Sequence, residues 1–160
     1  MVPTSDEGSP APIDRPILEH LRDRLETTRQ FVNVRITDED GHLELRATLQ
    51  ETYYPDEVIA AELFVRWYTN DDFKIHYRER HSSGEWECRW DRHPNPHNTR
   101  GHFHPPPTAQ TPGRDEQWPD DYRDVIQLLL DEIERRIQVL WSESGKLRDA
   151  TVVGGRAGPP

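Results

Sequence analysis

The sequence predicts an α+β fold in which an antiparallel sheet of about five strands carries two amphipathic helices on one face. Both ends of the foldable chain show apolar residues at helical spacing, whereas the middle alternates apolar and polar residues. Short polar turns separate the alternating segments, so the strands are expected to be joined as hairpins. Hairpins imply antiparallel pairing, and helices on one face leave the other face in water.

The N-terminal helix is expected from Asp14 to about Gln30. Asp14 can cap the helix, and Pro16 suits its first turn because a proline there loses no helical hydrogen bond. The apolar residues behind this cap recur at helical spacing and predict one buried face: Ile17, Leu18, Leu21 and Leu25.

A first β-hairpin is expected next, because alternation continues on both sides of a turn at residues 38–41. A four-residue loop would set Ile36 opposite Leu43 and Arg35 opposite Glu44, which is a favourable charge pair. A third strand is expected over residues 58–68. Its core-facing residues would be Ala61, Leu63, Val65 and Trp67.

A second hairpin is expected from Phe73–Arg80 and Glu85–Asp91, turning through residues 81–84. One register sets opposite charges and apolar residues against each other across the strands. Its pairs are Arg80–Glu85, Arg78–Glu87, Lys74–Asp91, Tyr77–Cys88 and Ile75–Trp90, with His76 opposite Arg89 on the polar face. Trp90 is therefore expected in the core and Arg89 outside it.

The last helix is expected to begin at Pro119 with Asp120 or Asp121, after a loop over residues 108–118. Gly145 is a plausible residue to end it. The stripe that would bury this helix consists of Tyr122, Val125, Ile126, Leu129, Ile133, Ile137, Leu140 and Trp141.

Composition predicts one domain over residues 14–148, with disordered tails at residues 1–13 and 149–160 that are rich in Pro, Gly and Ser or acidic residues. The net charge of −10 argues against nucleic-acid binding by the whole surface. Only Lys74 and Lys146 are lysines, which is typical of halophilic or high-GC organisms. No signal peptide or membrane span is recognisable, so a cytoplasmic protein without membrane contact is expected.

The segment from Cys88 to Pro107, CRWDRHPNPHNTRGHFHPPP, concentrates residues capable of chemistry. Its prolines predict a stiff loop that is neither helix nor inner strand, and that is dispensable for folding. From Asp71 to His104 six basic and six acidic residues balance, so the negative charge lies elsewhere. A local phosphate site is therefore possible here.

Histidine and arginine suffice for metal-independent cleavage of RNA, which needs a base, an acid and charge stabilisation. The phosphate-binding candidates are Arg78 and Arg89. The candidates for proton transfer are His76, Asp91, His93, His97, His102 and His104.

Two alternatives remain open for the same residues. His93, His97, His102 and His104 would bind zinc or another divalent metal in a non-catalytic metal-binding or interaction module. A solvated sheet face with surface histidines of no special role is the other alternative. Cys88 lies between Trp86 and Trp90 in the alternation, which indicates a core residue rather than a nucleophile.

The segment from Phe73 to Pro107 also resembles the TumE family of prokaryotic toxins. The resemblance rests on the hairpin strand Phe73–Tyr77, the turn at Gly84, the Arg89-Trp90-Asp91 strand end, His93-Pro94 and the His102–His104 group. It implies the toxin half of a toxin–antitoxin pair, with a cognate antitoxin as partner and RNA or translation as the target.

Overall fold

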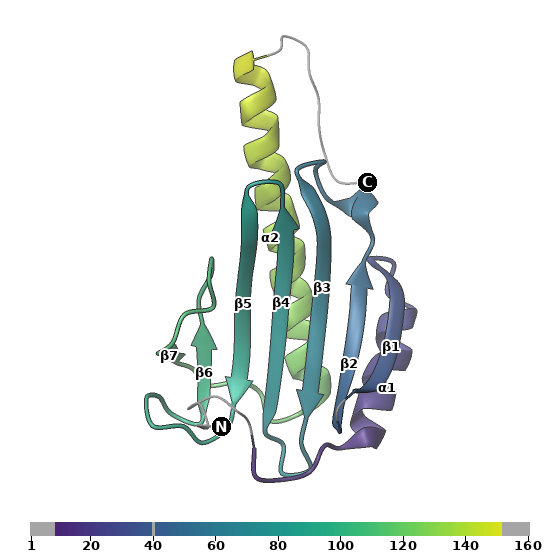
Figure 1. Ribbon diagram of the computed structural model, residues 1–160, viewed down its shortest axis with the longest axis vertical. Coiled ribbons are helices and arrows are strands. Elements are labelled where there is room, and N and C mark those ends of the chain that lie inside the picture. The colour runs from purple at the N-terminus through teal and green to yellow at the C-terminus, as the bar shows by residue number, and fades with distance from the viewer. Residues whose placement is uncertain (1–8, 40, 152–160) are drawn as a thin grey trace.

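The computed structural model describes residues 9–39 and 41–151, with side chains up to residue 145. Seven strands form one antiparallel sheet in the order β1-β2-β3-β4-β5-β6-β7, so every strand pairs with its neighbours in the chain (Figure 1). The strands are β1 (Phe31–Glu39), β2 (His42–Leu49), β3 (Val58–Trp67), β4 (Phe73–His81), β5 (Gly84–Arg92), β6 (Gly101–His104) and β7 (Arg114–Asp115). The helices are α1 (Arg15–Glu26), the short 3-10 turn η1 (Glu51–Tyr53) and α2 (Tyr122–Thr151).

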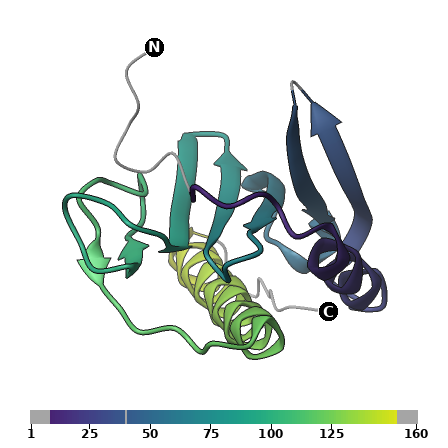
Figure 2. The same cartoon turned by 90° about the horizontal axis from the view of Figure 1, so that it is seen from below.

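Both α-helices lie on the same face of the sheet, as the sequence predicts (Figure 2). The helical stripes and the inward-facing strand residues form one core, whose largest fully buried members are Trp67, Tyr77 and Phe73. A buried ion pair fixes α2 against β4, because the Arg136 guanidinium donates to both oxygens of Glu79 at 3.0 and 2.8 Å. The opposite face of the central strands is left uncovered by helices (Figure 1).

The second hairpin confirms its predicted register pair by pair, including His76 opposite Arg89. The first hairpin does not. Ile36 pairs with Leu45 and Arg35 pairs with Arg46, because β1 and β2 continue to Glu39 and His42 instead of ending at a four-residue loop. Gly41 adopts a φ of +74°, which an L side chain rarely takes, and so permits the tighter turn.

The predicted stiff loop from Cys88 to Pro107 is wrong in part. Gly101–His104 is an inner strand, β6, which pairs with β5 on one side and with β7 on the other. No proline lies between Pro96 and Pro105, so four consecutive residues can donate to the ladder. The loop expected over residues 108–118 likewise contains the two-residue strand β7.

Described residues lie on both sides of the predicted domain boundaries at residues 14 and 148. Residues 9–13, expected in a tail, lie against the β3–β4 turn, where Ser9 Oγ donates to Asp72 Oδ2 at 2.6 Å. Residues 1–8 and 152–160 lie outside the described part. Helix α2 runs through Gly145 to Thr151, so the predicted end at Gly145 is wrong.

Neither described α-helix combines the length and hydrophobicity needed to span a bilayer.

Candidate functional site

The open face of the sheet carries a hollow of about 360 Å³ over β2 to β5. We call it the basic face. Five cationic side chains and a single carboxylate, Glu44, line it together with one histidine and one aromatic ring. The lining residues are Glu44, Arg46, Phe64, Arg66, Lys74, His76, Arg78 and Arg89. They meet because all of them occupy outward positions in the alternation of four adjacent strands.

Carboxylates hold the guanidinium groups of the basic face in place. Arg66 Nε lies 3.0 Å from Glu44 Oε2, and Arg46 Nε lies 3.2 Å from Glu44 Oε1. Arg78 Nη2 lies 3.3 Å from an oxygen of Glu62. A guanidinium has five N–H donors, so these contacts position each group and leave further donors for a bound anion.

Phe64 lies at the centre of the basic face on β3. The guanidinium carbons of Arg78 and Arg46 lie 5.2 and 5.6 Å from its ring centroid, and the His76 ring lies at 5.8 Å. Aromatic rings bordered by arginine form the stacking surfaces on which single-stranded nucleic acids place their bases. The face therefore offers contacts for both the phosphates and the bases of such a strand.

His76 is the histidine of this face. Its Nε2 lies 2.8 Å from Glu87 Oε1 on β5. Burial lowers the pKa of His76 from its ordinary value, and the hydrogen bond to Glu87 counters that effect only in part. The ring is therefore neutral at neutral pH. With Nε2–H donated to the carboxylate, Nδ1 carries the lone pair, as a general base requires.

A second group of candidate residues lies next to the basic face but inside the protein. We call it the buried corner: Asp91, His93, His102 and His104, whose exposed fractions are 0, 0, 0 and 1%. The Nε2 atoms of His93, His104 and His102 lie 3.2, 3.4 and 3.6 Å from Asp91 Oδ2. The β5–β6 register produces this convergence, because His102 is opposite Asp91 and His104 is opposite Arg89.

The segments around β6 and β7 form contacts that enclose the buried corner. His104 Nδ1 lies 2.9 Å from the Gln110 carbonyl oxygen, and Asn98 Nδ2 donates to the Gly113 carbonyl oxygen at 2.8 Å. A Cβ on Gly113 would lie 2.4 Å from Phe103 O, so the chain there passes closer to β6 than any other residue allows. Trp118 Nε1 donates to the Asp91 carbonyl oxygen at 2.9 Å.

Asp91 is ionised in the buried corner. Burial opposes its ionisation, but the contacts with His102, His104 and His93 and the charge of Arg89 outweigh burial and hold the pKa of Asp91 well below its ordinary value. Arg89 Nε donates to Oδ2 at 2.9 Å. Among the described residues, Asp91 Oδ1 accepts no hydrogen bond although it is fully buried.

The predicted site residues thus divide between two places. His76, Arg78 and Arg89 lie on the basic face, and Arg89 also reaches the buried corner. The exposed His97 lies on the loop between β5 and β6, outside both groups. The sequence analysis missed Arg46, Phe64 and Arg66. The alternation of β2 and β3 could have found them, because it places them opposite the predicted core positions.

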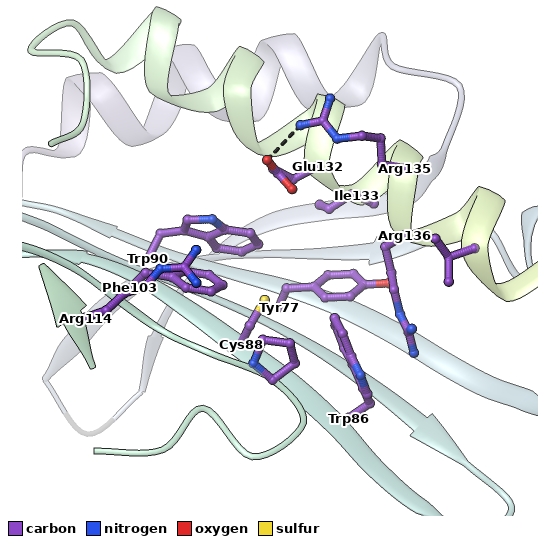
Figure 3. A pocket seen from close by; sticks show the side chains of 12 residues that line it. Tyr77, Trp86, Cys88, Trp90, Phe103, Arg114, Glu132, Ile133, Arg135 and Arg136 are labelled. Carbon is purple, nitrogen blue, oxygen red and sulfur yellow. Dashed lines mark hydrogen bonds and ion pairs between the residues drawn. The ribbon is translucent and has the colours of Figure 1, made fainter. Parts of the chain in front are cut away.

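A second hollow, of about 330 Å³, lies between α2 and strands β4 to β6. Figure 3 shows its largely apolar floor, with Trp86, Trp90 and Phe103 below Ile133 of the helix. Cys88 lies in this floor, and burial raises the pKa of its thiol far above the ordinary value. Cys88 is therefore a protonated core thiol and not a nucleophile, as the alternation indicates.

The buried corner also holds a group that could bind a metal. One ligand atom each from Asp91, His102 and His104 lies within 4.8 Å of the other two. His93 and His97, two of the four predicted metal ligands, do not belong to this group, which contains Asp91 instead. Cysteine plays no part here, since the single Cys88 faces the helices.

The family model described as Toxin TumE matches residues 14–137, which is most of the chain and includes both the basic face and the buried corner. Comparison with curated proteins and with solved structures finds no match. The match extends well beyond the segment that resembles the family in the sequence alone. The chain therefore belongs to the TumE family of toxins and is the toxin of a toxin–antitoxin system.

Proposed function

We propose that this toxin acts on RNA in the cytoplasm through its basic face, and that a cognate antitoxin restrains it. One observation carries the proposal. On a chain of net charge −10, five cations gather around one aromatic ring on the sheet face opposite the described helices. Charges farther apart than a Debye length of about 8 Å are largely screened at physiological salt, so the acidic remainder need not repel a strand bound here.

Binding would use arginine for the backbone and Phe64 for the bases. Arg46, Arg66 and Arg78 come from three adjacent strands, so a single strand could cross them while its phosphates meet successive guanidinium groups. The surrounding carboxylates keep the arginine side chains extended over the sheet. Such a surface selects flexible single-stranded RNA over a regular duplex, whose bases cannot reach a stacking ring.

His76 would act as the general base that cleaves the bound RNA. In this reaction the 2′-oxygen bonds to the adjacent phosphorus, the bond from phosphorus to the 5′-oxygen breaks, and the product carries a 2′,3′-cyclic phosphate. His76 Nδ1 takes the proton of the 2′-hydroxyl, with Glu87 orienting the ring, and the leaving 5′-oxygen takes a proton from solvent. Arg78 and Arg89 stabilise the charge on the phosphate oxygens.

Growth after induction tests this assignment. Wild type, Arg78→Ala and His76→Ala are induced at equal protein level without antitoxin, and Arg135→Ala serves as the matched control. Arg135 is a mostly exposed arginine on α2 that forms an ion pair with its helix neighbour Glu132. We expect wild type and Arg135→Ala to arrest growth, whereas Arg78→Ala and His76→Ala permit it.

Two results would contradict the proposal. Equal arrest by all four proteins would place the toxic activity away from the basic face. Arrest by wild type with no binding of the purified protein to single-stranded RNA would keep the toxin but remove RNA as its target.

A further inference from the structure

We propose that the buried corner is a structural site for a divalent transition metal of the zinc class, with Asp91, His102 and His104 as ligands. The site is separate from the basic face and does not depend on RNA as the target. Its ligands are 0 to 1% exposed, so no substrate can reach the ion. Because its ligands are buried, the ion would stabilise the fold, and its binding free energy would add to the free energy of folding.

The spacing of the ligand atoms fits a tetrahedral ion. Ligand atoms about 2.0–2.2 Å from a tetrahedral zinc lie about 3.3–3.6 Å from each other. The Nε2 atoms of His104 and His102 lie 3.4 and 3.6 Å from Asp91 Oδ2. These two distances match those that such an ion would impose, and all three ligand atoms lie within 4.8 Å of one another.

The hydrogen bonds of the two rings point to the same role. His102 Nδ1 lies 3.1 Å from the Thr99 and Arg100 carbonyl oxygens, and His104 Nδ1 lies 2.9 Å from that of Gln110. Carbonyl oxygens only accept, so a proton on Nδ1 satisfies these contacts, and the Nε2 atom of each ring faces Asp91 Oδ2. A backbone carbonyl that fixes the ring in this way is the usual outer partner of a metal-bound histidine.

Asp91 is an ionised carboxylate in a dry interior, where its charge needs a compensating cation. Arg89 supplies part of that charge, since its Nε donates to Asp91 Oδ2 at 2.9 Å and its Nη2 lies 3.1 Å from His104 Nε2. Asp91 Oδ1 still accepts no hydrogen bond from the described residues. A divalent ion would bind the carboxylate and both rings at once.

Arg89 and the metal therefore compete for the same atoms. The Arg89 side chain is 19% exposed and also lines the basic face, so it can turn toward that face when an ion enters. This movement provides an entry path. It also predicts that shortening Arg89 tightens metal binding, a result that a purely structural arginine–carboxylate pair would not give.

The test measures Zn²⁺ and Co²⁺ binding to the untagged, chelator-stripped protein by calorimetry and by the visible absorption of bound Co²⁺. Variants are Asp91→Asn and His104→Gln, which keep the side-chain volume, together with Arg89→Ala. His97→Ala is the matched control, because it removes an exposed histidine of the same region. Circular dichroism confirms that each variant is folded.

We expect one ion per chain and an affinity at least about tenfold weaker in His104→Gln. Arg89→Ala should bind more tightly than wild type, and His97→Ala should match it. Zinc should raise the melting temperature of wild type and not of His104→Gln. If Asp91→Asn does not fold, the binding and melting measurements on His104→Gln still test the proposal. No stoichiometric binding by wild type, or equal binding by wild type and His104→Gln, would overturn the proposal.

Discussion

The basic face and the buried corner lie side by side on one face of one sheet and use the same residue types. Each combines histidine, arginine and carboxylate, and Arg89 belongs to both. The difference is what lies over them. In the described part of the chain, His76 and Arg78 remain partly open to solvent, whereas the chain around β6 and β7 encloses Asp91 and His102. Identical chemistry thus serves contact with a ligand in one place and internal order in the other.

The two regions differ in the cost of losing a charge. A solvated ion pair contributes little to stability, because water replaces the lost partner, whereas a buried charge that loses its partner is left without compensation. The same comparison explains the division of roles that we propose. Exposed cations such as Arg66 and Arg78 can exchange a carboxylate for a phosphate, whereas no phosphate can reach the buried Asp91.

The largest predicted effect is on stability in the buried corner. Asp91→Ala should lower the free energy of unfolding by about 3–5 kcal/mol, because it leaves the Arg89 charge without its buried partner. Arg78→Ala, on the basic face, should change it by less than about 1 kcal/mol. Urea unfolding of both variants measures the difference, and a larger loss in Arg78→Ala would contradict the distinction between the regions.

The same contribution should depend on pH. The folded pKa of Asp91 lies well below its ordinary value of 3.8, so its stabilising effect is complete above pH 3.8 and disappears only as the pH falls through the folded value. The stability gap between wild type and Asp91→Ala should therefore stay constant from pH 7 down to about pH 4. A gap that closes already at pH 6 would mean that another group carries the effect.

A smaller effect is expected where the chain that encloses the corner packs closely. A Cβ on Gly101 would lie 2.4 Å from the Glu116 carbonyl oxygen, so Gly101→Ala should cost about 1–3 kcal/mol by forcing β6 and residue 116 apart. Gly145→Ala is the matched control. It meets nothing within 4 Å and lies inside α2, so it should stabilise by about 0.5–1 kcal/mol. Equal effects of the two changes would show that the close contact does not matter.

On the basic face, arginine substitutions should alter the salt dependence of RNA binding. Each phosphate contact contributes about 0.7 to the slope of log affinity against log salt for a single strand. Arg66→Ala and Arg78→Ala should each reduce the slope by about that amount, whereas Arg135→Ala should not. Fluorescence titration at several salt concentrations measures the slope. Unchanged slopes in both basic-face variants would exclude phosphate binding there.

The smallest predicted effect concerns the acid side of the pH–rate profile. The pKa of His76 lies below 6.5, so cleavage should rise with pH through a value below 6.5 and be level at neutral pH. Glu87 favours the protonated ring, so Glu87→Gln should move that rise to lower pH. A rise above pH 7 would point to a different base.

Much of the fold could be predicted from alternation, because paired charges and apolar residues specify the second hairpin register uniquely. The first hairpin lacks such a complete set of matching charged and apolar pairs, and the turn at Gly41 determines its register instead. The site was harder to predict. His102 and His104 were expected in an exposed loop because prolines flank them, yet four proline-free residues sufficed for β6. Sequence pattern gives the face of a strand, and it does not show which distant segment covers that face.

The most direct test of the central claim is cleavage of a single-stranded RNA by the purified toxin, with DNA of the same sequence as control. Wild type should cut the RNA, leave 2′,3′-cyclic phosphate ends and spare the DNA, which has no 2′-hydroxyl. His76→Ala should be slower by about 10²- to 10⁴-fold, and His97→Ala should match wild type. Cleavage of both nucleic acids, or an His76→Ala variant as active as wild type, would contradict the account.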